Sequence, residues 1–211
     1  MMKKTNSLVS HLTLVLALGL AILGTGCTHM VKISVKPASF PVAEKLPHQA
    51  VLVINSDLQN YKYEFPMMGD KWVFPFGQSL QDYARQVANA SFQQVKEVSS
   101  EEKAAGETSA DLILVPRAVK ADQGLGGAFA WDKVNFTLVV EWIAKDRATH
   151  NTVWLKTITS DASETGGNAF TGDSHRKILM QKLFDDLSMK TFNAMQNAPE
   201  LKSPKAVVEK K

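Results

Sequence analysis

The chain has 211 residues, of which 45% are apolar, and a formal net charge of +3. This length and apolar content predict one folded domain with a proper core and exclude a compositionally disordered chain. A single cysteine excludes an internal disulfide framework, and the near-neutral charge gives no global argument for binding nucleic acid.

The first 26 residues have the order of a secretory signal. Lys3 and Lys4 give a positive start, an uncharged apolar run extends over residues 12–23, and residues 24–26 are small. The apolar run is shorter than the ~20 residues that span a bilayer. We therefore expect residues 1–26 to be a signal peptide. Its removal leaves 22 basic and 21 acidic residues, because Lys3 and Lys4 are lost.

The segment LGTGC, which ends at the sole cysteine, resembles the lipobox of bacterial lipoproteins. Leu23 lies one position further from the cysteine than that family prefers. The resemblance implies that Cys27 carries a diacylglycerol on its thiol and that the chain is cut before Cys27. It also implies that the new amino group is open to acylation by a fatty acid such as palmitate. Thr28, where an Asp would imply inner-membrane retention, implies the outer membrane, with the domain facing the periplasm.

The alternative is an ordinary signal peptide that happens to end near a cysteine. An unpaired cysteine in an exported chain needs an explanation, and lipidation supplies one. Two or three acyl chains also make a lasting membrane anchor where one does not. We therefore expect residues 27–48 to form a lipidated anchor and tether.

The next segments predict the first strands. Residues 30–36 alternate apolar and polar side chains, and Pro37, Pro41 and Pro47 then mark a linker. Residues 49–55 are a short apolar run rich in β-branched side chains, which predicts a central strand. Aromatic alternation over residues 61–65 and 71–74, around Gly69, predicts a hairpin of edge strands.

Residues 79–95 carry apolar side chains at positions i, i+3, i+4 and i+7 over four turns. This spacing predicts an amphipathic helix that packs on the core, with Ser79 as its N-cap. Residues 97–110 are small and polar and indicate a surface loop. Residues 112–120 predict a strand in which Pro116 requires an edge position or a bulge.

The second half predicts a strong hairpin and a second helix. Residues 134–145 and 152–160 alternate on either side of a turn, and residues 161–173 form a loop. Residues 174–196 carry a second apolar stripe, ended by Pro199, and the basic tail over residues 199–211 is expected to be disordered. The predicted fold is α+β: a mostly antiparallel sheet with two amphipathic helices on one face, in one domain over residues 49–198.

The loop GLGGAFAW over residues 124–131 is glycine-rich and apolar. It is not a phosphate loop, because no Gly-Lys-Ser/Thr follows and it does not open a helix. One interpretation is a flexible hairpin loop, in which Trp131 opens the next strand. The other is a partner or lipid contact made by Leu125, Phe129 and Trp131, since exposed aromatic side chains are poor choices for a solvated turn.

The sequence contains no recognisable catalytic motif. His29, His48, His150 and His175 are isolated and are interpreted as exposed, no pair has helical metal-ligand spacing, and no Gly-x-Ser-x-Gly elbow occurs. The paired carboxylates at residues 101–102 and 185–186 are interpreted as solvated surface. We assign no catalytic residue, metal or cofactor, although folding can bring distant side chains together.

The function expected from these features is a non-enzymatic, lipid-anchored binding or accessory module of the cell envelope. Its expected partners are the membrane, through the lipid on Cys27, and an envelope protein. The element order vaguely resembles small accessory lipoproteins that serve lipopolysaccharide assembly or lipid-transport ABC systems, which implies little about function. The alternatives are a lipid-anchored hydrolase and a carrier of an apolar ligand.

Overall fold

The computed structural model describes residues 27–67, 70–125, 133–165 and 173–202. The predicted signal peptide lies outside these residues. The chain divides into two units, Met1–Val31 with Glu64–Val73 and Lys32–Tyr63 with Phe74–Lys211.

The first unit is built around a three-stranded sheet in the order β1-β4-β3. Its strands are β1 (Thr28–Met30), β3 (Lys62–Met67) and β4 (Asp70–Pro75). β3 and β4 are the two predicted hairpin strands. Pro66 lies in the edge strand β3 as expected, but the edge position expected for β4 is wrong, because β4 lies between β1 and β3. β1 runs parallel to β4, with Thr28 opposite Lys71 and His29 opposite Trp72. The strand predicted over residues 30–36 is wrong: the strand ends at Met30, and no strand covers residues 32–36.

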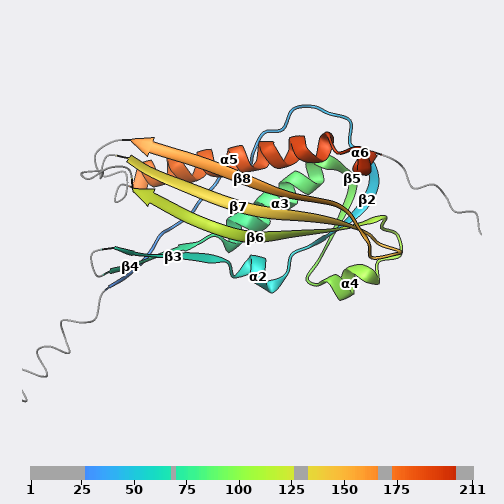
Figure 1. Cartoon of the computed structure of the whole chain (residues 1–211), viewed down its shortest axis with the longest axis horizontal. Coiled ribbons are helices and arrows are strands. Elements are labelled where there is room, and N and C mark those ends of the chain that lie inside the picture. Colours follow the sequence, from blue (N-terminus) through green and yellow to red (C-terminus); the bar gives the residue numbers. More distant parts are fainter. Residues whose placement is uncertain (1–26, 68–69, 126–132, 166–172, 203–211) are drawn as a thin grey trace, which may run out of the picture. The chain divides into compact units, whose positions relative to one another are not determined.

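The second unit contains a mixed five-stranded sheet in the order β5-β2-β6-β7-β8 (Figure 1). Its strands are β2 (Leu46–Val53), β5 (Phe92–Val98), β6 (Leu112–Leu125), β7 (Lys133–Asp146) and β8 (Thr152–Thr165). β6, β7 and β8 form long antiparallel pairs, whereas β2 pairs in parallel with both β5 and β6. Residues 49–53 of the predicted central strand do lie in the central strand β2, and the predicted 134–145/152–160 hairpin is confirmed.

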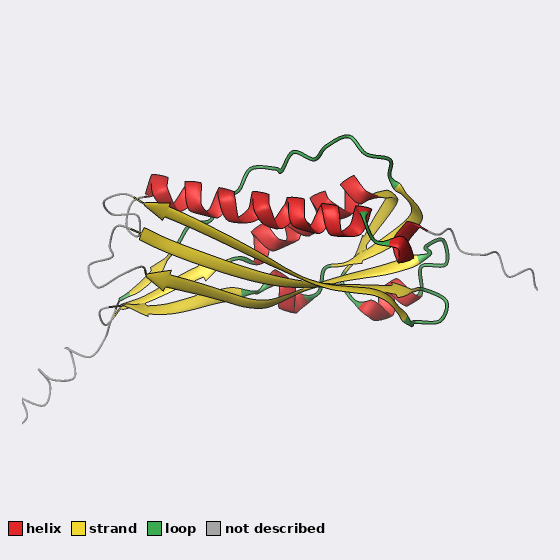
Figure 2. Ribbon diagram, turned by 45° about the horizontal axis from the view of Figure 1, so that its top comes forward, coloured by secondary structure: helices red, strands yellow, loops and turns green. Residues whose placement is uncertain are grey.

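Two long helices cover one face of this sheet, α3 (Gly77–Ser91) and α5 (Asp173–Gln196) (Figure 2). The indole of Trp142 in β7 donates to Tyr83 of α3, and Ser160 in β8 donates to the Leu183 carbonyl of α5. Trp142 and Ser160 point to the same side of the sheet. Ser160 pairs with Leu138 of β7, and Leu138 lies four residues before Trp142, so their side chains are on the same face of that strand. The predicted α+β fold with two helices on one face is confirmed.

Large side chains fill the space between these helices and the sheet. Phe76, Phe136 and Phe184 are each under 2% exposed, and Phe76 lies 5.4 Å from Phe136 and 6.1 Å from Phe184 between ring centroids. A smaller cluster lies on the opposite face, where Ala104 of α4 (Glu101–Ala105) packs with Val53 and Ile143. α4 occupies part of the predicted surface loop over residues 97–110.

Several predicted boundaries are wrong. The first long helix begins at Gly77 after an N-cap at Phe76, so Ser79 is a buried helix residue and not the cap. The helix ends at Ser91, and Phe92 begins β5 with an extended backbone.

Pro116 lies beyond the three β6 residues that pair with β2, and a register shift follows at Ala118, which agrees with the expected edge or bulge. Short helices also form at α2 (Ser56–Gln59) and α6 (Pro199–Lys202), the latter within the tail expected to be disordered.

Candidate functional site

The candidate site lies at Cys27, which is exposed and directly precedes β1. The Cys27 N–H donates to Asp70 Oδ1 at 2.9 Å, and the Cys27 carbonyl accepts from the Lys71 N–H at 2.9 Å. His29 Nε2 lies 2.9 Å from Asp70 Oδ2, and the His29 ring stacks on Trp72 with centroids 4.6 Å apart. We call Cys27, Thr28, His29, Asp70 and Trp72 the anchor cluster. It joins the candidate lipid-attachment residue to β4 within a single sheet.

The electrostatics of the anchor cluster favour an ionised Asp70. The hydrogen bond from His29 and, next, that from the Cys27 backbone hold the pKa of the Asp70 carboxyl below its usual value. Sequence reasoning identified Cys27 but missed Asp70, because the contact joins residues 43 positions apart. The strand β1 has only three residues, so its sequence has no periodicity that could have predicted its pairing with β4.

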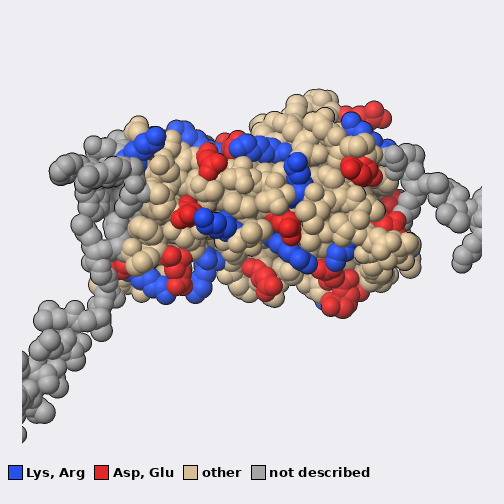
Figure 3. Space-filling model, in the orientation of Figure 1, with Lys and Arg blue, Asp and Glu red and all other residues tan. Residues whose placement is uncertain are grey.

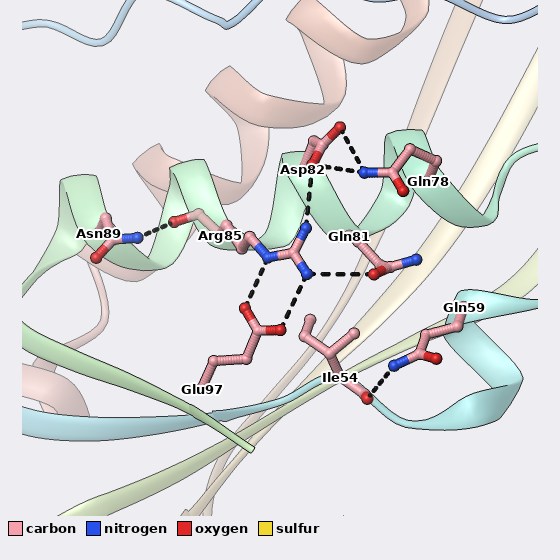
Figure 4. A network of polar contacts seen from close by, with 8 residues as sticks. All are labelled: Ile54, Gln59, Gln78, Gln81, Asp82, Arg85, Asn89 and Glu97. Atoms are coloured by element: carbon pink, nitrogen blue, oxygen red, sulfur yellow. Dashed lines mark hydrogen bonds and ion pairs between the residues drawn. The ribbon is translucent and has the colours of Figure 1, made fainter. Parts of the chain in front are cut away.

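A second polar cluster links α3 to β5 (Figure 4). Arg85 donates to both carboxylate oxygens of Glu97, at 2.6 and 2.9 Å, and to Asp82 Oδ1 at 3.1 Å. The hydrogen bond from Arg85 lowers the pKa of Glu97, so this carboxylate is ionised at neutral pH and cannot serve as a general acid. A bidentate arginine of this kind fixes β5 against the preceding helix and is structural.

A third feature is a surface groove of about 600 Å³ beside the edge strand β8. Trp154, Lys156 and Ile158 of β8 form one wall, and α5 and α6 form the other. Lys190 of α5 donates to the Thr159 carbonyl at 3.1 Å, which ties the helix to the strand inside the groove. On the face shown in Figure 3, basic and acidic side chains are intermixed, so this view shows no strongly charged docking surface.

The proposed contact residues of the glycine-rich loop fall mostly outside the described part of the chain. Leu125 is the last residue of β6, where its backbone pairs with Val134. Phe129 and Trp131 lie in the segment 126–132, which is not described. Their partner contact stays a prediction.

The histidines do not all match the expectation of exposed side chains. His48 is only 4% exposed, because buried and exposed side chains alternate at the start of β2 and His48 is at a buried position. Its Nδ1 lies 3.8 Å from Asp111 Oδ2. His29 belongs to the anchor cluster, and His175 Nδ1 lies 3.8 Å from Glu164. His150 is exposed in the β7–β8 turn, where its φ is 58°. Among the described residues, no three His, Cys, Asp or Glu side chains are grouped as metal ligands.

None of the helices in the described ranges is both long and apolar enough to cross a membrane. No protein-family model matches the sequence, and no curated protein sequence matches it. Solved structures do resemble the fold. Protein XCC0632 of Xanthomonas campestris, a DUF330 protein, is 12% identical, with a TM-score of 0.50 over 80% of this chain and 96% of that one. It shows the same fold and, at this identity, nothing about activity.

Two bacterial lipoproteins are more distant structural neighbours. The minor lipoprotein of Acinetobacter baumannii is 15% identical, with a TM-score of 0.36 over 68% of this chain and 87% of that one. Lipoprotein GNA1162 of Neisseria meningitidis is 9% identical, with a TM-score of 0.34 over 58% of this chain and 88% of that one. The fold comparison therefore rests on XCC0632.

Proposed function

We propose that this chain is a lipoprotein of the bacterial cell envelope that acts as a non-catalytic binding or accessory module. The observation that carries the proposal is the sole cysteine, which follows a signal-like segment and is exposed immediately before β1. An exposed thiol is open to thioether formation with a diacylglycerol. Thr28 at the next position supports the outer membrane as the destination, on the resemblance stated above.

The anchor cluster is compatible with both chemical forms of a processed N-terminus. An N-acylated Cys27 keeps one N–H, which can still donate to Asp70. An unacylated Cys27 presents an ammonium group to the same carboxylate, which is the stronger, charge-assisted form of the hydrogen bond. Processing before Cys27 therefore preserves the contact that holds β1 on β4.

The interior favours a binding module over a carrier of an apolar ligand. A carrier needs an apolar cavity of ~300–1,000 Å³ that encloses most of its ligand. The space between α3, α5 and the sheet is instead filled by Trp142, Phe76, Phe136 and Phe184, each under 2% exposed. The proposed protein partner would bind from outside, through the loop that carries Leu125, Phe129 and Trp131.

Metabolic labelling with an alkyne fatty acid tests the anchor. We expect wild-type protein to be labelled and to fractionate with outer membranes, and Cys27→Ser to be unlabelled and released. Thr28→Asp is the matched control: it should be labelled equally but move to the inner membrane. Equal labelling of wild type and Cys27→Ser would contradict lipidation at this residue.

Partner binding is tested with Phe129→Ser and Trp131→Ser. We expect both variants to lose capture of an envelope protein from detergent-solubilised membranes while their melting temperatures stay unchanged. A fall of several degrees in both melting temperatures would instead assign these aromatic side chains to the core.

A further inference from the structure

No residue separates the candidate lipid-attachment residue Cys27 from the three-stranded sheet. Cys27 is the residue before β1, and both of its backbone hydrogen bonds go to β4, through Asp70 and Lys71. A flexible tether would hold a domain away from the bilayer, but no such tether separates Cys27 from this sheet.

The distance from Cys27 along β1 can be compared with the depth of the headgroup layer of a bilayer. The polar headgroup layer is ~5–8 Å deep on each side of the hydrocarbon core. A strand advances ~3.3 Å per residue, so even Met30 lies within ~10 Å of Cys27 along β1. Thr28 lies much closer, and the register places Lys71 of β4 directly opposite it. A diacylglyceryl group at Cys27 therefore brings β1 and the adjoining end of β4 to the headgroup layer.

Several contacts besides those of Cys27 hold β1 on β4. The Val31 N–H donates to the Val73 carbonyl at 2.9 Å and closes the far end of the strand pair. His29 contributes both the contact with Asp70 and the ring stacking on Trp72. The anchored residue and the sheet thus move as one piece.

The side chains near Cys27 suit a membrane interface. Trp72 is half-buried and Met30 is 66% exposed, and tryptophan is enriched where bilayer and water meet. The Asp70 carboxylate has a hydrogen-bond partner in His29, and Lys71 pairs with Glu64 at 2.5 Å. The contact should therefore depend on the anchor and on apolar side chains, with little dependence on salt.

We propose that the end of the three-stranded sheet at which β1 and β4 begin is a membrane-contact surface. The lipid on Cys27 holds this end in the headgroup layer. The proposal rests on the lipidation proposed above. It commits to a phospholipid surface, and it concerns only the unit that contains β1 and β4.

The test places a fluorophore on this surface in the lipidated protein. Lipidation blocks the Cys27 thiol, so Met30→Cys supplies the only free thiol for an environment-sensitive dye, and Lys71→Cys is a second position should the first variant misfold. The labelled proteins are reconstituted into phosphatidylethanolamine–phosphatidylglycerol vesicles that carry nitroxide headgroups. Mass spectrometry first verifies the lipid on Cys27.

The matched control is a Gly/Ser insertion of about ten residues between Cys27 and Thr28, which adds an r.m.s. reach of ~18 Å and leaves the anchor in place. We expect quenching and a blue shift with the native spacing and loss of both with the insertion. Equal signals from the two lipidated proteins would overturn the membrane contact and leave the proposed function standing. A missing lipid on Cys27 would overturn both.

Discussion

The Tyr83 hydroxyl accepts a hydrogen bond from the Trp142 indole Nε1–H at 2.7 Å and lies 2.6 Å from the Thr191 hydroxyl. All three side chains are buried, and they come from α3, β7 and α5. Thr191 in turn donates to the Leu187 carbonyl at 2.8 Å. This buried chain of polar groups fixes how both helices pack on the sheet, because each group has its partner only in this one arrangement.

Tyr83→Phe should lower the free energy of unfolding by about 1–3 kcal/mol, because it leaves the Trp142 indole N–H buried without an acceptor. The same substitution in a Trp142→Phe background should cost less, since no indole donor remains. Urea denaturation of the four proteins measures the coupling. Strictly additive losses would show that the two side chains do not interact.

Burial raises the pKa of Tyr83 well above its usual value, and the hydrogen bonds with Thr191 and Trp142 offset this only in part. The unfolded chain therefore loses the Tyr83 proton at lower pH than the folded protein does. The stability that this group contributes is complete below about pH 10 and falls above it, by up to ~1.4 kcal/mol per pH unit. Denaturation between pH 9 and 11.5 should show this decline, and Tyr83→Phe should flatten it.

The boundary between α3 and β5 shows where sequence patterns stop being informative. Phe92 and Val95 continue the helical apolar spacing, so the sequence predicts one helix over residues 79–95. In the structure Phe92 is extended and pairs with Leu46 of β2. That parallel pairing is a long-range contact, and it overrides a local preference that was itself weak in this polar segment.

The long hairpin of β7 and β8 was predictable because its information is local: alternation, a short turn, alternation again. The anchor cluster was only half predictable. Cys27 is marked by the signal-like segment before it, whereas the pairing of β1 with β4 depends on Asp70, which no nearby pattern connects to Cys27. The sequence therefore indicated Cys27 as the candidate attachment residue but not the sheet to which Cys27 is bonded.

Phe92→Ala should destabilise the protein by about 3–5 kcal/mol, because Phe92 is completely buried although it lies outside the helix. Gln93→Ala is the matched control at the next, exposed position and should change stability by less than ~0.5 kcal/mol. Chemical denaturation compares the two. A loss below ~1 kcal/mol for Phe92→Ala would place this ring outside the core.

Gly77 begins α3 where the chain passes very close to α2. A Cβ at Gly77 would lie 1.8 Å from the Gln59 carbonyl oxygen, which is backbone and cannot rotate away. The Gly77 N–H also donates to the Tyr61 carbonyl at 3.0 Å, which holds the two segments together. Gly77→Ala should therefore cost at least ~2–3 kcal/mol.

Gly106→Ala is the control for this substitution. The nearest atom to a Cβ there is the Lys103 carbonyl oxygen at 3.4 Å, an ordinary contact. Its effect on the denaturation midpoint should be small. Similar midpoints for the two alanine variants would mean that α2 and α3 can separate without cost.

The helix α6 lies at the start of the tail that was expected to be disordered. Leu201 is completely buried, and its N–H donates to the Ala198 carbonyl at 3.2 Å. Leu201→Ala should lower stability by about 2–5 kcal/mol, as for other buried leucines. Glu200→Ala, at the exposed neighbouring position, should have an effect within ~0.5 kcal/mol. Thermal melts of both variants test whether this segment is ordered. If α6 packs on the core, only Leu201→Ala should lower the melting temperature. If the segment is disordered, neither substitution should change it.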